Sequence, residues 1–111
     1  MSYNNVTPVK LGQAAIGTSA STLYTVPAAT RTYVKDIDVV NTGTASATFD
    51  VYLVGSGGSV STATALIYQQ PLGPKQIFSW NGTQILNAGD TIQVLASATG
   101  LTINASGGEG A

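Results

Sequence analysis

The sequence contains no cysteine and no histidine. Without cysteine there is no disulfide framework, thiol nucleophile, iron–sulfur cluster or thiolate zinc site. Without histidine the chain lacks the usual general base at neutral pH and the commonest transition-metal ligand, so a Ser-His-Asp arrangement cannot be assembled. We therefore predict a protein that is not an enzyme, with no catalytic residues, no metal and no cofactor.

Charge is also scarce, because only 8% of the 111 residues are charged, against roughly 25% in an ordinary soluble domain. The net charge of −1 provides no basic field for a phosphate backbone, so we expect no nucleic-acid partner. The N-terminal segment is polar, and no apolar run approaches the ~18–20 residues of a spanning helix, so we expect neither a secretory signal nor membrane contact. We expect the chain to fold in a cytoplasm.

Short runs of β-favouring residues, each closed by Gly, Pro, Asn or Asp, cover most of the chain. Eight or nine such runs at a spacing of roughly 8–12 residues predict an all-β fold, an antiparallel β-sandwich of jelly-roll-like form. The predicted strands are residues 9–16, 22–26, 30–40, 47–54, 64–69, 76–80, 83–86, 90–96 and 101–105.

Turn residues and composition divide the chain further. Asn81-Gly82 between two β-runs predicts a two-residue hairpin, because a type I′ turn needs positive φ at both central positions. We predict one sandwich domain at residues 9–106, preceded by an extended N-terminal arm (1–8) and followed by a flexible C-terminal tail (107–111).

Alternation along the predicted strands separates the two faces of each strand. The predicted core residues are Ile37, Val39, Phe49, Val51, Leu53, Ile92, Val94, Leu101 and Ile103. Val40, Tyr52 and Val54 fall on the opposite face, so some strands are partly apolar on both sides. This pattern fits a sandwich whose outer face is covered by a neighbouring subunit, and it fits ordinary β-propensity at exposed positions equally well.

Three acids form a candidate cluster, because Asp36 and Asp38 share one face of their strand. If residues 41–45 form a hairpin, Asp50 lies opposite one of them, and opposed like charges invite a cation such as Ca²⁺. A hydrolase with paired carboxylates is a further alternative, although a strand face is too open for it. Solubility, edge protection or contact with a partner's basic residues explains the cluster better, so no metal is assigned.

Four residues are candidates for partner contact: Tyr3, Val6, Val9 and Trp80. Tyr3, Val6 and Val9 give the N-terminal arm apolar character, which favours an arm that orders on a neighbour over a frayed end. Trp80, with Phe78, Tyr68 and Tyr24, could form an aromatic platform for a sugar ring. The simpler explanation is that Phe78 is core and Trp80 shields the hairpin turn.

Three segments together resemble small β-sandwich virion proteins of tailed bacteriophages, of the head decoration or cement type: LYTVPAA (23–29), VKDIDVVNTG (34–43) and ILNAGDTIQV (85–94). The resemblance spans about residues 14–106 and rests on turn and strand motifs, so no functional residue carries over. It implies a capsid decoration protein that binds the assembled head and clamps neighbouring subunits of the major capsid protein, as a homotrimer or homodimer on the capsid surface of the virion. Synthesis would take place in the host bacterial cytoplasm.

The alternative is a tail, baseplate or head-fibre component that binds a receptor or glycan, for which Trp80 is the obvious contact. The low charge favours the assembly role. A surface of small, neutral side chains suits close packing against other protein and offers little to catalysis.

Overall fold

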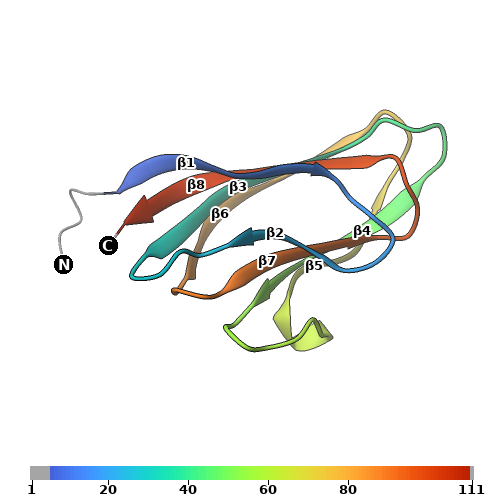
Figure 1. The fold of residues 1–111 in the computed structure, drawn as a ribbon. Helices are drawn as coiled ribbons and strands as arrows, with labels where there is room; N and C mark the ends of the chain where they lie inside the picture. The colour runs from blue at the N-terminus through green and yellow to red at the C-terminus, as the bar shows by residue number, and fades with distance from the viewer. Residues whose placement is uncertain (1–5, 111) are drawn as a thin grey trace.

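The computed structural model describes residues 6–110, which form two four-stranded antiparallel sheets packed face to face (Figure 1). Eight strands are present in these residues: β1 (Thr7–Ala15), β2 (Ser21–Thr25), β3 (Arg31–Asn41), β4 (Ala47–Val54), β5 (Ala65–Leu72), β6 (Ile77–Leu86), β7 (Thr91–Ala96) and β8 (Leu101–Gly110). A short 3-10 turn, Thr62–Thr64, precedes β5. Within residues 6–110 no helix has the length or apolar character to cross a membrane.

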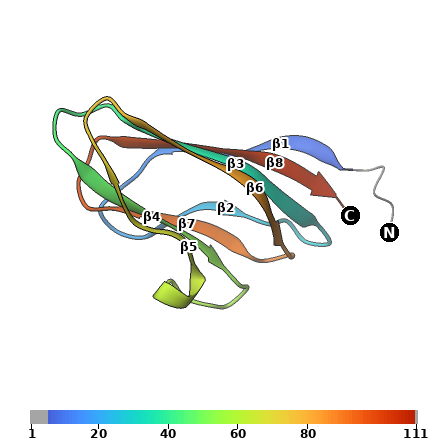
Figure 2. The same ribbon diagram turned by 180° about the vertical axis from the view of Figure 1, so that it is seen from behind.

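The strand order is β1-β8-β3-β6 in one sheet, called sheet A here, and β2-β7-β4-β5 in the other, called sheet B. Figure 2 shows the same two layers from behind. Every connection except the one from β4 to β5 crosses between the sheets. The first strand pairs with the last, the second with the seventh and the fourth with the fifth, so the pairs are nested around the sandwich.

The core lies between the sheets and contains the residues that alternation predicted. Phe49, Ile37, Ile92, Leu101 and Ile103 are fully buried. The Phe49 ring of β4 meets the Phe78 ring of β6 edge to face, with centroids 5.5 Å apart, and so joins the two sheets. Each fully buried apolar side chain of this size contributes roughly 1.5–3 kcal/mol to stability. The sandwich prediction is confirmed.

The predicted hairpin at Asn81-Gly82 is wrong, because β6 runs unbroken through both residues. Asn81 pairs with Asp36 of β3 and Gln84 pairs with Val34, so Gly82 and Thr83 form a bulge opposite Lys35. A glycine suits this bulge, because a Cβ at position 82 would lie 3.0 Å from the Trp80 ring. Pairing with β3 along the whole strand outweighs the local turn preference.

The expected tail at 107–111 also needs correction, since Gly107–Gly110 are the last residues of β8. Here β8 pairs on one side with β1, including Thr7 and Pro8 of the expected arm, and on the other side with β3. A Cβ at position 107 would collide with the backbone oxygen of Tyr33, so glycine allows the strands to approach. Hydrogen bonding on both sides holds a segment whose composition suggested flexibility.

Candidate interaction surface

The outer face of sheet A, which points away from the core, is the candidate functional site. Strand pairing aligns its outward residues in four rows that cross β1, β8, β3 and β6 in that order. Row 1 is Pro8, Gly108, Tyr33 and Ile85, and row 4 is Ala15, Thr102, Val40 and Ile77. Row 2 is Lys10, Ser106, Asp36 and Asn81, and row 3 is Gln13, Asn104, Asp38 and Ser79. The two end rows are mainly apolar and the two middle rows are polar.

Large apolar side chains stand exposed in the end rows. Ile77 is 69% exposed in row 4, Ile85 is 57% exposed in row 1, and Val6, beside Gly108, is 41% exposed. Exposed apolar groups gathered on one face of a small domain mark an interaction site more often than scattered ones do.

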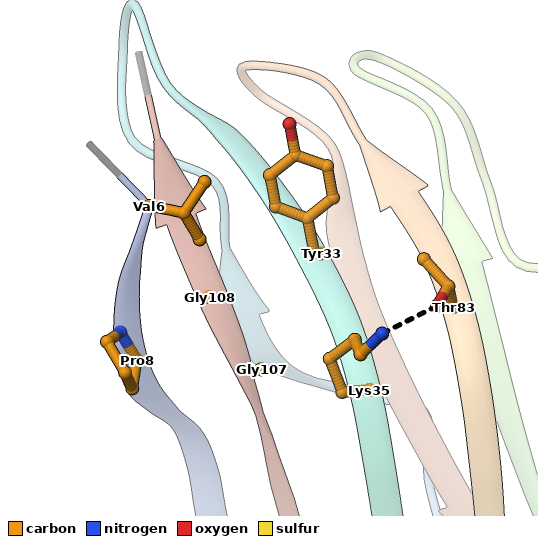
Figure 3. Close-up of a pocket in the computed structure, with 7 residues that line it drawn as sticks. All are labelled: Val6, Pro8, Tyr33, Lys35, Thr83, Gly107 and Gly108. Carbon is orange, nitrogen blue, oxygen red and sulfur yellow. Dashed lines mark hydrogen bonds between the residues drawn. The ribbon is translucent and has the colours of Figure 1, made fainter. Parts of the chain in front are cut away.

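A hollow of about 400 Å³ opens at row 1, lined by Val6, Pro8, Tyr33, Lys35, Thr83, Gly107 and Gly108 (Figure 3). The glycines place no side chain on its floor. The Lys35 ammonium donates a hydrogen bond to Thr83 Oγ1 at 2.8 Å, which lays the methylene groups of the lysine along the hollow. A second groove shares Pro8, Lys35 and Gly107 with this hollow and continues to Asp38 and Asn104 in row 3.

Four of the nine charged residues of the chain belong to this face: Lys10, Lys35, Asp36 and Asp38. The formal charges of these four cancel, and Arg31 at the start of β3, which pairs with Gly110 beyond row 1, lies on the same side by alternation. Ser79 Oγ donates to Asp38 Oδ1 at 2.7 Å. A hydrogen bond between the two carboxyl groups, together with partial burial and the negative charge of Asp38, raises the pKa of Asp36.

The third acid of the predicted cluster, Asp50, is elsewhere. β3 and β4 are not paired, because the chain crosses from sheet A to sheet B between them, so the predicted hairpin and its register are wrong. Asp50 is 6% exposed and accepts hydrogen bonds from Tyr52 Oη at 2.7 Å and from the Gln69 backbone nitrogen at 2.6 Å. It therefore fixes the bulge of β5, where Gln69 has φ of 48°. Within residues 6–110 no group of three or more potential metal ligands comes together.

The other candidate residues are dispersed. Trp80 pairs with Ile37 on the inner face of sheet A and packs, partly buried, against the core. Val9 likewise packs against the core, Val6 lies on the outer face, and Tyr3 is outside the described residues.

The proposed aromatic platform does not form. Phe78 packs on Phe49, while Tyr68 is 50% exposed in β5 of sheet B. Tyr24 in β2 hydrogen-bonds to Thr32 Oγ1 at 2.7 Å and to the Glu109 carboxylate, which ties β2 to sheet A. Burial, followed by the hydrogen bond to Glu109 and the negative charge of Glu109, raises the pKa of Tyr24 to about 12, although the hydrogen bond to Thr32 acts in the opposite direction.

Sequence reasoning missed Tyr33, Ile77 and Ile85 as surface residues. The available signal was the apolar residues on both faces of some strands, of which Val40 in row 4 is one. That signal could not distinguish the outer face of sheet A from that of sheet B.

The four edge strands are poorly suited to pairing with another chain. Bulges or register shifts interrupt β1, β2, β6 and β5. In addition, β1 contains Pro8 and β5 contains Pro71. Bulges and prolines protect exposed edges from adding a further strand. The broad faces are therefore the better surfaces for assembly.

No protein-family model matches the chain, and no curated protein matches it. Among solved structures, the chain is similar to one of the infectious bursal disease virus Gx strain, with a TM-score of 0.49 and 11% identity over 94% of this chain and 32% of that one. It is also similar to the infectious bursal disease virus VP2 subviral particle, with a TM-score of 0.46, 12% identity and coverage of 94% and 31%.

A third similar structure is a pentameric capsid protein isolated from metagenomic phage sequences, with a TM-score of 0.37, 14% identity and coverage of 98% and 62%. This chain thus spans about a third of the length of the first two structures. Because these TM-scores lie below 0.5, we infer function from the surface described above.

Proposed function

We propose that the chain is a non-enzymatic structural protein of a viral particle, a decoration or cement protein that binds an assembled phage head. The observation that carries the proposal is the outer face of sheet A. It has an apolar–polar–polar–apolar pattern with little net charge, on a sandwich whose edges carry bulges or prolines. Such a face suits broad contact with other protein.

The strand order supports the same proposal. We infer that the nested pairs and the orders β1-β8-β3-β6 and β2-β7-β4-β5 are those of a jelly roll, an architecture of viral capsid domains. The resemblance of residues 14–106 to tailed-phage virion proteins supports assignment to a phage head. The partner is then the major capsid protein, and the location is the capsid surface.

Binding to the shell and not to its free subunits would stabilise the shell by mass action. The N-terminal end is the proposed shell contact, since Val6 is exposed where the chain enters β1 and residues 1–5 precede it. Many copies on one particle would combine modest single contacts into avid binding. A homotrimer or homodimer would add to this.

A receptor- or glycan-binding role in a tail, baseplate or head fibre is favoured less. It needs an exposed aromatic residue at a loop cluster, whereas Trp80 packs on the core beside Ile37.

Electron cryo-microscopy of purified particles tests the proposal. We expect density for this sandwich on the outer surface of the head at many symmetry-related positions. Density confined to the tail or a fibre would overturn it, as would particles that lack the chain. Deleting residues 1–5 is expected to reduce occupancy on the head, and unchanged occupancy would refute the N-terminal contact.

A further inference from the structure

We propose that the outer face of sheet A binds a second copy of the same chain. The two sheets stack face to face around a two-fold axis that lies between them, parallel to the strands. The proposal deepens the proposed function by naming the partner on this face, and it rests on that function only for the biological use of the dimer.

About this axis each row lies opposite the same row of the second copy, and the four strands of one copy face those of the other in reverse order. Because the order is β1-β8-β3-β6, β1 faces β6 and β8 faces β3. A symmetric interface requires a patch that complements itself in this way. The four rows can therefore be tested pair by pair.

The apolar end rows match in size. In row 1 Tyr33 faces Gly108 and Ile85 faces Pro8, while in row 4 Ile77 faces Ala15. Each large side chain thus meets a small or flat residue. The hollow of about 400 Å³ beside Gly107 and Gly108 accommodates the ring of Tyr33 from the second copy.

The polar middle rows match in hydrogen-bonding character and charge. Asp36 faces Ser106 and Asp38 faces Asn104, so each carboxyl group meets a hydroxyl or amide donor. Lys10 lies on β1, which faces β6 of the second copy, and Asp36 of that copy is offset sideways by one strand spacing, about 4.8 Å, within reach of the long lysine side chain. Asp36 and Asp38 of the two copies also lie one strand apart across the axis, so these carboxyl groups are offset and do not directly face each other.

Charge also decides between the possible axes. A two-fold axis perpendicular to the strands would place row 2 on row 3 and row 1 on row 4. Asp36 would then face Asp38 of the second copy, and Tyr33 would face Val40 instead of a glycine. Carboxylates face each other directly only in that arrangement, whereas the axis parallel to the strands offsets them by one strand and places Tyr33 on a glycine. The axis parallel to the strands is therefore favoured.

The area of the face is close to the lower limit for a specific contact. The face is about 19 Å wide across its four strands and about 24 Å long from row 1 to row 4, which gives about 450 Å² per copy. Two copies together reach about 900 Å² of flat area, and side chains add to it, which approaches the roughly 1,000 Å² of a specific interface.

Reversal of charge on the 111-residue chain tests the proposal. One variant carries K10E and K35E, so the four charged positions of the rows and the bulge are all acidic, and the other carries D36K and D38K, so these four positions are all basic. We expect the unmodified chain to sediment at twice its 11.2 kDa monomer mass. Each variant alone is expected to have a dimer dissociation constant raised about tenfold or more, because four like charges then face four.

An equimolar mixture of the two variants is expected to restore the dimer as a heterodimer, because acidic and basic faces then meet. A merely destabilised variant would not be rescued in this way. K75E is the matched control, since Lys75 lies in the β5–β6 connection and its reversal should leave the mass unchanged. Circular dichroism verifies that each variant is folded.

A monomer or trimer for the unmodified chain would overturn the proposal. So would a dimer that neither pair of reversals weakens, or variants whose mixture stays monomeric. A monomer that still occupies the phage head would refute only the dimer, whereas a dimer absent from the head would refute only the proposed function.

Discussion

The outer faces of the two sheets differ in how far their outward side chains are exposed. On sheet B the outward residues Tyr52 and Val54 are 4% and 2% exposed, and the polar Asp50 is 6% exposed. On this sheet β5 pairs with β4 edge to edge, and the short 3-10 turn before β5 also contacts β4 (Figure 2). On sheet A the outward residues Ile77 and Ile85 stay exposed. A sheet face whose apolar side chains stay exposed among residues 6–110 is available to a partner.

The strongest test of this contrast is Asp50→Ala on sheet B. It removes the acceptor for Tyr52 Oη and for the Gln69 backbone nitrogen, and leaves both donors in a buried site. We expect a loss of about 2–4 kcal/mol in the free energy of unfolding, measured by urea denaturation. Asp36→Ala on sheet A is the matched control, with a change within about 0.5 kcal/mol. Equal losses would contradict the contrast.

The hydrogen-bonded pair of Asp50 and Tyr52 predicts that the free energy of unfolding falls at alkaline pH. The hydrogen bond to Asp50, with burial and the Asp50 charge, raises the pKa of Tyr52 from 10.0 to about 12. A raised pKa means that the folded state favours the neutral phenol. This contribution is complete below pH 10 and is lost as the pH rises to 12, amounting to about 2–3 kcal/mol.

Urea unfolding between pH 9 and pH 12 measures this loss. Tyr52→Phe has no phenol to ionise at this position, so its stability should fall less over the same range, with Tyr24 contributing to the remaining dependence. Parallel pH profiles for the two proteins would be inconsistent with the assigned hydrogen bond.

Ile85→Asp tests the uncovered face with a smaller effect on folding. Ile85 is 57% exposed, so unfolding free energy should change by no more than about 0.5 kcal/mol. Sedimentation should show weaker self-association, because a charge would then face Pro8 of the second copy. Tyr68→Asp, at an exposed position in β5 of sheet B, is the control and should not alter the mass. Weaker self-association of Tyr68→Asp, with no change for Ile85→Asp, would place the interface on sheet B instead.

The smallest expected effect concerns the carboxyl pair of sheet A. The hydrogen bond from Asp38 raises the pKa of Asp36, so the proton shared by the pair adds stability at acidic pH that is lost as the pH rises through that pKa. Asp38→Asn removes the neighbouring charge, and the pKa of Asp36 should move down toward its ordinary value. Carbon-13 NMR of the carboxyl groups measures the shift, and no change would argue against the pairing.

Part of the candidate site was predictable from the sequence. Asp36 and Asp38 share a face because strand side chains alternate, and Val40 was recognised as apolar on the outer side. Ile77 and Ile85 were not recognised, because the predicted break at Asn81-Gly82 placed them on two separate strands. In the structure one bulged strand carries both.

The proposed role of Asp50 beside Asp36 failed for a different reason. It assumed that consecutive strands pair, whereas β3 pairs with β6 and β8. A sandwich is stabilised by pairing between strands that are far apart in the sequence. The five residues between β3 and β4 are enough to carry the chain to the other sheet. Local turn composition contains no information on that choice.

The sequence by itself determined the absence of thiol and imidazole chemistry, the all-β class and the division of most strands into core and outer residues. These properties depend on composition and on a period of two, which are local. Only the tertiary structure decided that the glycine-rich end joins sheet A, that Asp50 is buried on sheet B, and that the apolar and polar rows of sheet A align. Those features arise from pairing between distant strands, whose register fixes which side chains share a face.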